Sequence, residues 1–300
     1  MNASTLVSVG LPVRNGERTV TQAAQSVLAQ DHTNLELIIC DNASTDGTEE
    51  VCRALAAADE RVRYHRRPVD IGLVPNFIGV LALAKGTWFR WIGDSDHMDT
   101  TYLSRCLELA DDDAQLILIS TQIGYEMPDD RLVAGDYRGT ALASADPSIR
   151  FAEMLRLLTS GFTDLDPLYS LIRRDRLAQL PYRHMLRGDE VYAARIALAG
   201  PWGHLPEVLA RRGWEPAKPV RIARRLSLPR WQAPIASELQ CFELLKVIDD
   251  VELTAEQRRR ARAAVGRLYQ TRKVNAVDRA RRRIPRALSE AAKRFSSRAS

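Results

Sequence analysis

The first 100 residues alternate short strand-like segments, rich in apolar and β-branched residues, with segments whose apolar residues recur at helical spacing. The predicted strands are residues 5–13, 35–40, 61–65 and 88–92, and the predicted helices are residues 19–29, 48–58 and 75–84. Such alternation is typical of a mostly parallel sheet that helices cover on both faces. We therefore expect an α/β fold.

Polar clusters follow three of these predicted strands, at the point where each strand ends. They are residues 14–17, 41–46 and 94–96. Ligands of parallel α/β sheets bind outside the carboxyl ends of the strands. Three such clusters in succession therefore predict one ligand site at this edge of the sheet.

The third cluster carries two carboxylates, Asp94 and Asp96, directly after an aromatic strand and Gly93. Residues i and i+2 of an extended segment point to the same face, so the two carboxylates can converge. Like charges at one point need a cation or strong donors between them, and magnesium-like ions prefer one or two carboxylates plus phosphate oxygens. The pattern favours a metal–diphosphate site, and its alternative is a solvent-exposed acidic turn.

Two common nucleotide-binding loops are absent from the sequence. Residues 41–48 contain one Gly and no Lys, which excludes a P-loop, and no Gly-x-Gly-x-x-Gly is present, which disfavours a Rossmann dehydrogenase. The four Cys residues have no metal-binding spacing and are expected to be reduced. With no signal peptide and no apolar stretch approaching ~20 residues, we expect a cytoplasmic protein.

The charge of the chain is distributed unevenly. Residues 257–300 contain 15 Lys and Arg against 2 Asp and Glu, whereas residues 1–256 contain 28 against 36. Three interpretations of the basic segment are a solvated helical face, a surface for anionic lipid and a nucleic-acid-binding element. Because the segment has only Tyr269 and Phe295 as aromatic residues and no recognised module, we expect no nucleic-acid partner.

The second half of the chain has fewer clear signals. Strands are expected at residues 115–120 and 207–210, and helices at residues 148–158, 191–199, 237–251, 254–269 and 279–297. Asp189 and Glu190 directly precede the helix 191–199, where acidic side chains also stabilise a helix start. The local pattern therefore leaves a structural and a catalytic role open for these two residues.

Residues 7–17 read Val-Ser-Val-Gly-Leu-Pro-Val-Arg-Asn-Gly-Glu, residues 37–48 read Leu-Ile-Ile-Cys-Asp-Asn-Ala-Ser-Thr-Asp-Gly-Thr, and residues 93–96 read Gly-Asp-Ser-Asp. Together these motifs resemble the inverting family 2 glycosyltransferases of GT-A fold, and a weaker match runs from Tyr169 to Arg212. The resemblance implies a nucleotide-sugar-binding half at residues 1–110 and an acceptor-binding half at residues 111–232. Residues 233–300 then form a helical, basic C-terminal extension.

The resemblance also implies roles for individual residues. Asp94 and Asp96 match the Asp-x-Asp motif that holds Mg²⁺ or Mn²⁺ on the donor diphosphate, and Asp189 matches the general base for the acceptor hydroxyl. Asp41 is expected to face the base of the nucleotide. The residues expected to bind the nucleotide sugar are Pro12, Arg14, Asn15, Glu17, Asp41, Asp70, Gly72, Asn76, Asp94 and Ser95.

The sequence departs from the family pattern at three places. His97 follows Asp96 where many members have another aspartate, and it is expected to be an exposed loop residue or a ligand. Trp214 stands where related sequences often have a His, so a third protein ligand for the metal is not identified. No Gln-x-x-Arg-Trp is present, which favours a non-processive enzyme.

With this resemblance, the sequence predicts a metal-dependent inverting glycosyltransferase that moves one sugar from a UDP- or dTDP-linked donor to an acceptor hydroxyl. The resemblance also implies a place in cell-envelope glycan or glycolipid synthesis. The expected partners are the donor, a glycan or lipid-linked acceptor and, through residues 257–300, the inner face of the cytoplasmic membrane. One alternative is a nucleotidyltransferase, although no glycine-rich, basic triphosphate loop follows the first strand. The other is a catalytically inactive sugar-nucleotide-binding scaffold.

Overall fold

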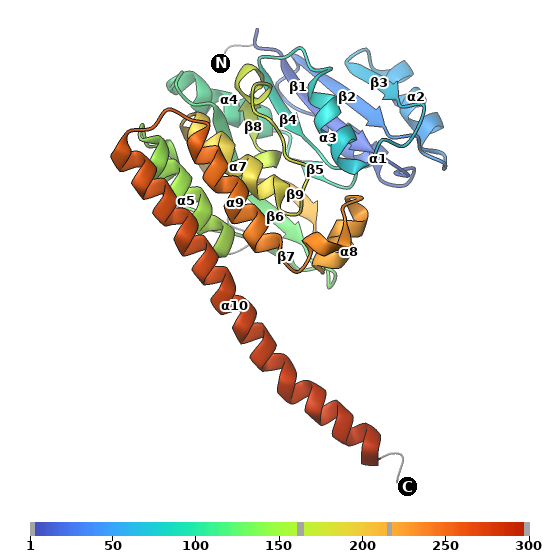
Figure 1. Cartoon of the computed structure of the whole chain (residues 1–300). Helices are drawn as coiled ribbons and strands as arrows, with labels where there is room; N and C mark the ends of the chain where they lie inside the picture. The colour runs from blue at the N-terminus through green and yellow to red at the C-terminus, as the bar shows by residue number, and fades with distance from the viewer. Residues whose placement is uncertain (1–3, 161–164, 215–217, 297–300) are drawn as a thin grey trace.

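The computed structural model of the chain describes residues 4–160, 165–214 and 218–296, with side chains up to Val277. In this described part, nine strands form one sheet with the order β3-β2-β1-β4-β8-β6-β9-β5, and β7 pairs with β6 (Figure 1). The strands are β1 Val7–Val13, β2 Leu35–Asp41, β3 Val62–Arg66, β4 Trp88–Trp91, β5 His97–Met98, β6 Leu118–Glu126, β7 Leu132–Ala134, β8 Leu171–Arg173 and β9 Trp202–Gly213. The α-helices are α1 Val20–Leu28, α2 Thr48–Ala58, α3 Leu73–Leu81, α4 Tyr102–Asp112, α5 Pro147–Ser160, α6 Arg174–Leu177, α7 Gly188–Ala199, α8 Pro219–Arg225, α9 Ala236–Asp249 and α10 Ala255–Ser296.

The first four strands are parallel and are connected by α1, α2 and α3. Strand β1 lies between β2 and β4, and β3 pairs on the outer side of β2. The register places Val13 beside Asp41 and Asp41 beside Arg66, so the carboxyl ends of β1, β2 and β3 lie together. Parallel strands need a crossover connection, and α1, α2 and α3 provide these connections here. The predicted alternation of strands and helices is therefore confirmed.

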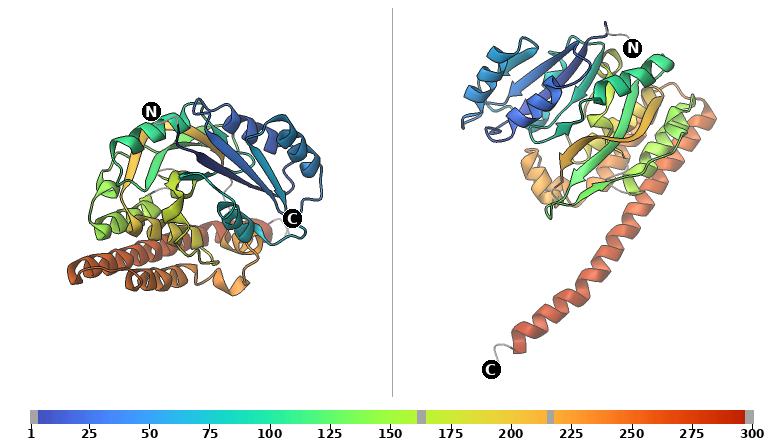
Figure 2. Two further views of the ribbon diagram at one scale, coloured as in Figure 1. Left: turned by 90° about the horizontal axis from the view of Figure 1, so that it is seen from above. Right: turned by 180° about the vertical axis from the view of Figure 1, so that it is seen from behind.

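Helices cover both faces of the sheet, as predicted (Figure 2). Helices α1, α2 and α4 pack on one face, and α3, α5 and α7 pack on the other. Strand β2 shows why both faces are apolar: Leu37 and Ile39 belong to the first cluster, whereas Ile38 and Cys40 belong to the second. Successive residues of a strand point to opposite faces, so a continuous apolar run fits a sheet buried on both sides.

The second half of the sheet is longer than predicted and partly antiparallel. Strands β6 and β9 pair in parallel over most of their lengths, whereas β8 pairs antiparallel with β4 and β6. Both β6 and β9 extend well beyond the strands predicted at residues 115–120 and 207–210. The extension of β6 was missed because Thr121 and Gln122 are polar, although both are buried there.

The C-terminal helices form a third layer over α5 and α7. Leu244 of α9 and Val265 of α10 share a buried cluster with Phe151 of α5 and Val191 of α7. Helix α10 is one helix of 42 residues, so the prediction of separate helices at residues 254–269 and 279–297 was wrong. The residues between them, 270–278, contain no Gly or Pro and can therefore continue a helix.

Beyond the body of the molecule, the C-terminal part of α10 extends alone (Figure 1). The predicted end of the basic helix at residue 297 lies outside the described residues. Among the described residues, no helix combines the length and the apolar character that are needed to cross a membrane.

Candidate active site

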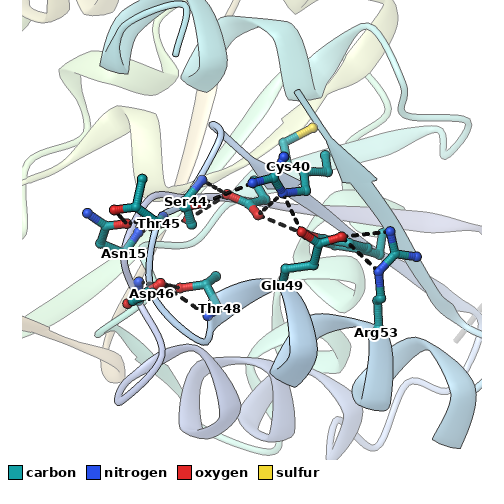
Figure 3. A network of polar contacts seen from close by, with 12 residues as sticks. Asn15, Cys40, Ser44, Thr45, Asp46, Thr48, Glu49 and Arg53 are labelled. Carbon is teal, nitrogen blue, oxygen red and sulfur yellow. Dashed lines mark hydrogen bonds and ion pairs between the residues drawn. The ribbon is translucent and has the colours of Figure 1, made fainter. Parts of the chain in front are cut away.

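Hydrogen bonds join the loops that follow β1 and β2 (Figure 3). Asn15 has a left-handed backbone with φ of 56°; its N–H donates to Ser44 Oγ at 2.9 Å, and its Oδ1 accepts from Thr45 N at 2.9 Å. The N–H of Gly16 donates to Thr48 Oγ1 at 2.9 Å. The first two predicted polar clusters are therefore held together by their backbones as well as their side chains.

Asp41, which was predicted to face the base, is fully buried at the end of β2. Its Oδ1 accepts from Ser44 N at 2.9 Å and Ser44 Oγ at 2.5 Å, and its Oδ2 accepts from Tyr64 Oη at 2.8 Å. Arg66 Nε lies 3.5 Å from the same Oδ2. Burial and the hydrogen bond to Asp41 raise the pKa of Tyr64. In this geometry Asp41 shapes the 41–48 loop from inside the protein.

Asn42 ties the loop before α3 to the end of β2. Its Nδ2 donates to Asp70 Oδ1 at 2.6 Å, and its Oδ1 accepts from Ile71 N at 2.9 Å. Asp70 also accepts from Gly72 N at 2.8 Å, which is the largest cause lowering the pKa of Asp70, and it pairs with Arg14 at 3.2 Å. Gly72 has φ of 88°, a conformation that favours glycine. The structure thus brings Arg14, from the loop after β1, together with Asp70 and Gly72, from the loop before α3. Asn42, which holds Asp70, was not among the predicted site residues.

The other residues predicted to bind the nucleotide differ in how deeply they are buried. Asn76 is buried, and its Nδ2 donates to Cys40 O at 2.8 Å, which fixes α3 against β2. No hydrogen-bond partner for Asn76 Oδ1 is found among the described residues. Pro12 is half-buried within β1, whereas Glu17 and Ser95 are exposed beside the loops.

The acidic loop after β4 places its two carboxylates in different surroundings. Asp94 is half-buried, and its Oδ2 accepts from Thr19 Oγ1 at 2.9 Å. Asp96 is 5% exposed; its Oδ2 accepts from Gly93 N at 2.9 Å and lies 3.1 Å from Arg212 Nε. The alternative of a solvent-exposed acidic turn is therefore wrong for Asp96.

The donor chemistry of this loop fits a hard divalent cation. The carboxylates of Asp94 and Asp96 offer the oxygen ligands that Mg²⁺ prefers, with water and phosphate oxygens completing its shell. Within the described parts of the chain, no three His, Cys, Asp or Glu side chains are grouped so that they could hold a metal. His97 is exposed on β5, and Trp214 packs edge-on against Tyr125 at 5.8 Å.

Arg212, near the end of β9, connects the acidic loop to the second half of the protein. Besides Asp96, its Nη1 pairs with Asp166 Oδ2 at 2.5 Å, and its guanidinium lies 3.2 Å from the centroid of the Tyr169 ring. Burial raises the pKa of Asp166, although the charge of Arg212 acts in the opposite direction. Sequence reasoning did not include these residues in the site, because they come from separate segments that share no local pattern.

A cavity of about 340 Å³ adjoins this cluster, and Asp166 forms part of its wall. Leu157, Leu165 and Trp214 contribute to its largely apolar lining, and Asp189 lines it from the start of α7. Asp189 is exposed by its accessible surface, although many protein atoms lie around its carboxyl group and partly desolvate it. Burial, followed by the neighbouring charge of Glu190, raises the pKa of Asp189 to about 6.

Solved structures share this architecture. TarS 1–349 from S. aureus, in complex with UDP-GlcNAc, aligns with a TM-score of 0.62 at 15% identity, over 88% of this chain and 72% of that chain. The mannosyltransferase PcManGT from Pyrobaculum calidifontis, in complex with GDP-Man and Mn²⁺, aligns with a TM-score of 0.52 at 14% identity, over 91% and 87%. These similarities confirm the predicted GT-A-like fold.

Several relatives found by sequence are also named as glycosyltransferases. WfaP from Escherichia coli, named a UDP-Glc:alpha-D-GlcNAc-diphosphoundecaprenol beta-1,3-glucosyltransferase, is 25% identical over 151 residues, which are 50% of this chain and 56% of WfaP. The chain spans less than two thirds of the curated relatives compared with it, from 13% to 63% of their lengths. Residues 8–180, more than half of the chain, match the family described as glycosyl transferase family 2, and the chain therefore belongs to this family of glycosyltransferases.

Proposed function

We propose that this enzyme is a metal-dependent, inverting glycosyltransferase that moves a single sugar from a UDP- or dTDP-linked donor to an acceptor hydroxyl. The observation that carries the proposal is the series of contacts from Asp96 through Arg212 to Asp166. Because Asp166 and Asp189 line the same cavity, this series joins the acidic loop to a carboxylate suited to proton transfer.

Asp189 is the proposed general base. A base works best when its pKa lies near the operating pH, and the pKa of about 6 keeps Asp189 ionised at neutral pH while leaving it basic enough to accept a proton. Asp189 would take the proton of an acceptor hydroxyl that enters the cavity. With the base on the side opposite to the leaving diphosphate, one displacement inverts the anomeric carbon, as in inverting glycosidases.

The nucleotide sugar is proposed to bind along the loops after β1, β2 and β3. Arg14 and Asp70 are exposed there and lie at one place, next to the Gly72 backbone. Asp94 and Asp96 would hold Mg²⁺ or Mn²⁺, which would supply positive charge to the leaving diphosphate. The complexes of TarS with UDP-GlcNAc and of PcManGT with GDP-Man and Mn²⁺ support this assignment through the shared fold.

The acceptor is proposed to be a glycan or lipid-linked glycan used in cell-envelope synthesis. The cavity beside Asp189 is mostly apolar with a few acidic groups, a composition that binds organic ligands and orients them through a small number of polar contacts. The name of WfaP gives it a diphosphoundecaprenol-linked acceptor, which supports the same class of acceptor here.

A calorimetric titration tests the donor site. UDP, dTDP and GDP are each titrated with Mn²⁺, Mg²⁺ or EDTA into the wild-type protein and into Asp96→Ala. We expect one diphosphate to bind in a metal-dependent manner and to lose at least about tenfold in affinity in the variant. Binding that is equally tight in EDTA would contradict metal dependence, and no binding to any of the three would favour an inactive scaffold.

We also propose that the enzyme works in the cytoplasm and docks on the inner face of the membrane through the end of α10. Residues 278–300 contain 8 Lys and Arg against 2 Asp and Glu, and each basic residue near anionic lipid contributes about 1 kcal/mol. Truncation after Val277 removes this segment and retains Ala261 and Val265, which are buried in the third layer.

The truncated protein should sediment less with anionic vesicles and bind the nucleotide as the full chain does. Vesicles of neutral lipid are the control, because they should retain neither protein. Equal sedimentation of both proteins with anionic vesicles would rule out this docking role.

A further inference from the structure

A second carboxylate stands directly beside the proposed base. Glu190 follows Asp189 in α7, and its side chain is 21% exposed. The charge of Glu190 is the second cause, after burial, that raises the pKa of Asp189. Whatever holds or neutralises Glu190 therefore affects the proton affinity of Asp189.

Donors from three parts of the chain surround the Glu190 carboxylate. Arg187, just before α7, donates from Nη1 to Oε1 at 2.6 Å. Gln240 of α9 donates from Nε2 to Oε2 at 2.8 Å, and Arg272 of α10 donates from Nη2 to the same oxygen. Arg272 Nη1 also donates to Gln240 Oε1, so the two residues from the C-terminal helices bind each other as well.

The two members of this cluster that come from the C-terminal helices are buried, whereas Glu190 is 21% and Arg187 31% exposed. Arg272 is 8% exposed, and Gln240 is fully buried. Burying an arginine costs several kcal/mol of hydration, so a guanidinium at such a place needs a partner with good geometry. Among the residues that the structure describes, the charged or titratable groups near Asp189 and Glu190, besides Arg272, are Arg187, Asp166, Tyr182 and Cys241.

We propose that Arg272 is a positioning residue for the transfer reaction: by pairing with Glu190 it holds this carboxylate against α9 and α10 and offsets its charge beside Asp189. The inference rests on the proposed function, in which Asp189 is the base. The C-terminal helices would then contribute to the proton affinity of Asp189. Arg272 of α10 and Arg187 are the two arginines that donate to Glu190 among the described residues, so losing α10 would leave Arg187 alone.

Four variants separate this role from a merely structural one. Arg272→Ala removes the charge, Arg272→Lys keeps it, and Glu190→Gln removes the group on which Arg272 is proposed to act. Arg267→Ala is the matched control, because Arg267 is an exposed arginine on the same helix. The readouts are the ¹³C NMR titration of the Asp189 carboxyl, assigned by its loss in Asp189→Asn, and the pH profile of kcat/KM.

In Arg272→Ala the titration midpoint of Asp189 should rise by about one pH unit. A midpoint moving from about 6 to about 7 lowers kcat/KM at pH 6 about fivefold, with KM for the donor unchanged. Arg272→Lys and Arg267→Ala should titrate near the wild type. In Glu190→Gln the midpoint should fall, and adding Arg272→Ala to that variant should change it little.

An unchanged Asp189 midpoint in Arg272→Ala would overturn the inference, and so would a shift that persists in the Glu190→Gln background. The NMR titration does not depend on turnover. If the midpoint moves as expected but the acid limb of kcat/KM does not follow it, the inference about Arg272 stands and the assignment of Asp189 as the base fails.

Discussion

Replacing Asp189 by Asn tests the proposed mechanism most directly, because the variant keeps the size of the side chain and removes its ability to accept a proton. A positioned general base contributes about 10²–10⁴-fold to the rate. We therefore expect kcat to fall by about 10²–10⁴-fold in Asp189→Asn. Binding of the nucleotide should change little, since Asp189 lies in the cavity and not on the loops after β1 and β2.

The pH dependence of the wild-type enzyme gives a second measure of the same residue. The base acts in its ionised form, and burial and Glu190 raise the pKa of Asp189 to about 6. Activity is therefore fully present above this value and is lost as the pH falls through it, at a higher pH than for an ordinary Asp with a pKa of about 3.9. We expect kcat/KM to be half-maximal near pH 6 and about tenfold below its maximum at pH 5.

The assay follows release of the nucleoside diphosphate between pH 4.5 and pH 8, with the donor identified by the titration described above. Asp175→Asn is a suitable control, because Asp175 is an exposed carboxylate on α6. That variant should keep the wild-type rate and pH profile. Activity of Asp189→Asn within about tenfold of the wild type, or an acid limb centred near pH 4, would refute the assignment of the base.

Three further substitutions have expected outcomes. Asp96→Asn should weaken the Mn²⁺-dependent binding of the diphosphate at least about tenfold in calorimetry, and an unchanged metal dependence would contradict its role as a ligand. Asn42→Ala removes both bonds to the loop before α3 and should raise KM for the donor with kcat nearly unchanged; equal effects on both would argue against a binding role. Arg150→Ala should lower the free energy of unfolding in urea by at least about 3 kcal/mol, since Arg150 is 4% exposed and its guanidinium donates to four backbone carbonyls; a loss below about 1 kcal/mol would contradict this.

The first half of the fold could be predicted because its signals are local. Strands such as β2 are continuous apolar runs, and the turns after them carry polar residues within a few positions of the strand end. The pairing of parallel strands then brings these turns to one edge without any further information. The convergence of Arg14, Asp70 and Gly72 follows from this rule, although the position of Asn42 between them required the structure.

The second half was harder because its strands carry buried polar residues. Ser120 Oγ bonds His204 Nδ1 at 2.9 Å, and Gln122 Nε2 donates to Tyr137 O at 3.1 Å. These partners lie far away in the sequence, so the polar residues look like a loop when the sequence is considered alone. The same limit applies to the contacts of Arg212 with Asp96 and Asp166, since no local spacing relates the three.

Asp41 and Asp189 show what a motif leaves undecided about a carboxylate. Each was identified from a sequence match, yet their surroundings differ in kind. Both oxygens of Asp41 accept hydrogen bonds inside the protein, from Ser44 and from Tyr64, and the residue is fully buried. Asp189 faces a cavity, and its pKa is raised to about 6. A group that must gain and lose a proton in each turnover needs access to the acceptor and a pKa near the working pH, and Asp189 has both. The buried, hydrogen-bonded Asp41 instead suits a carboxylate that holds the 41–48 loop in place.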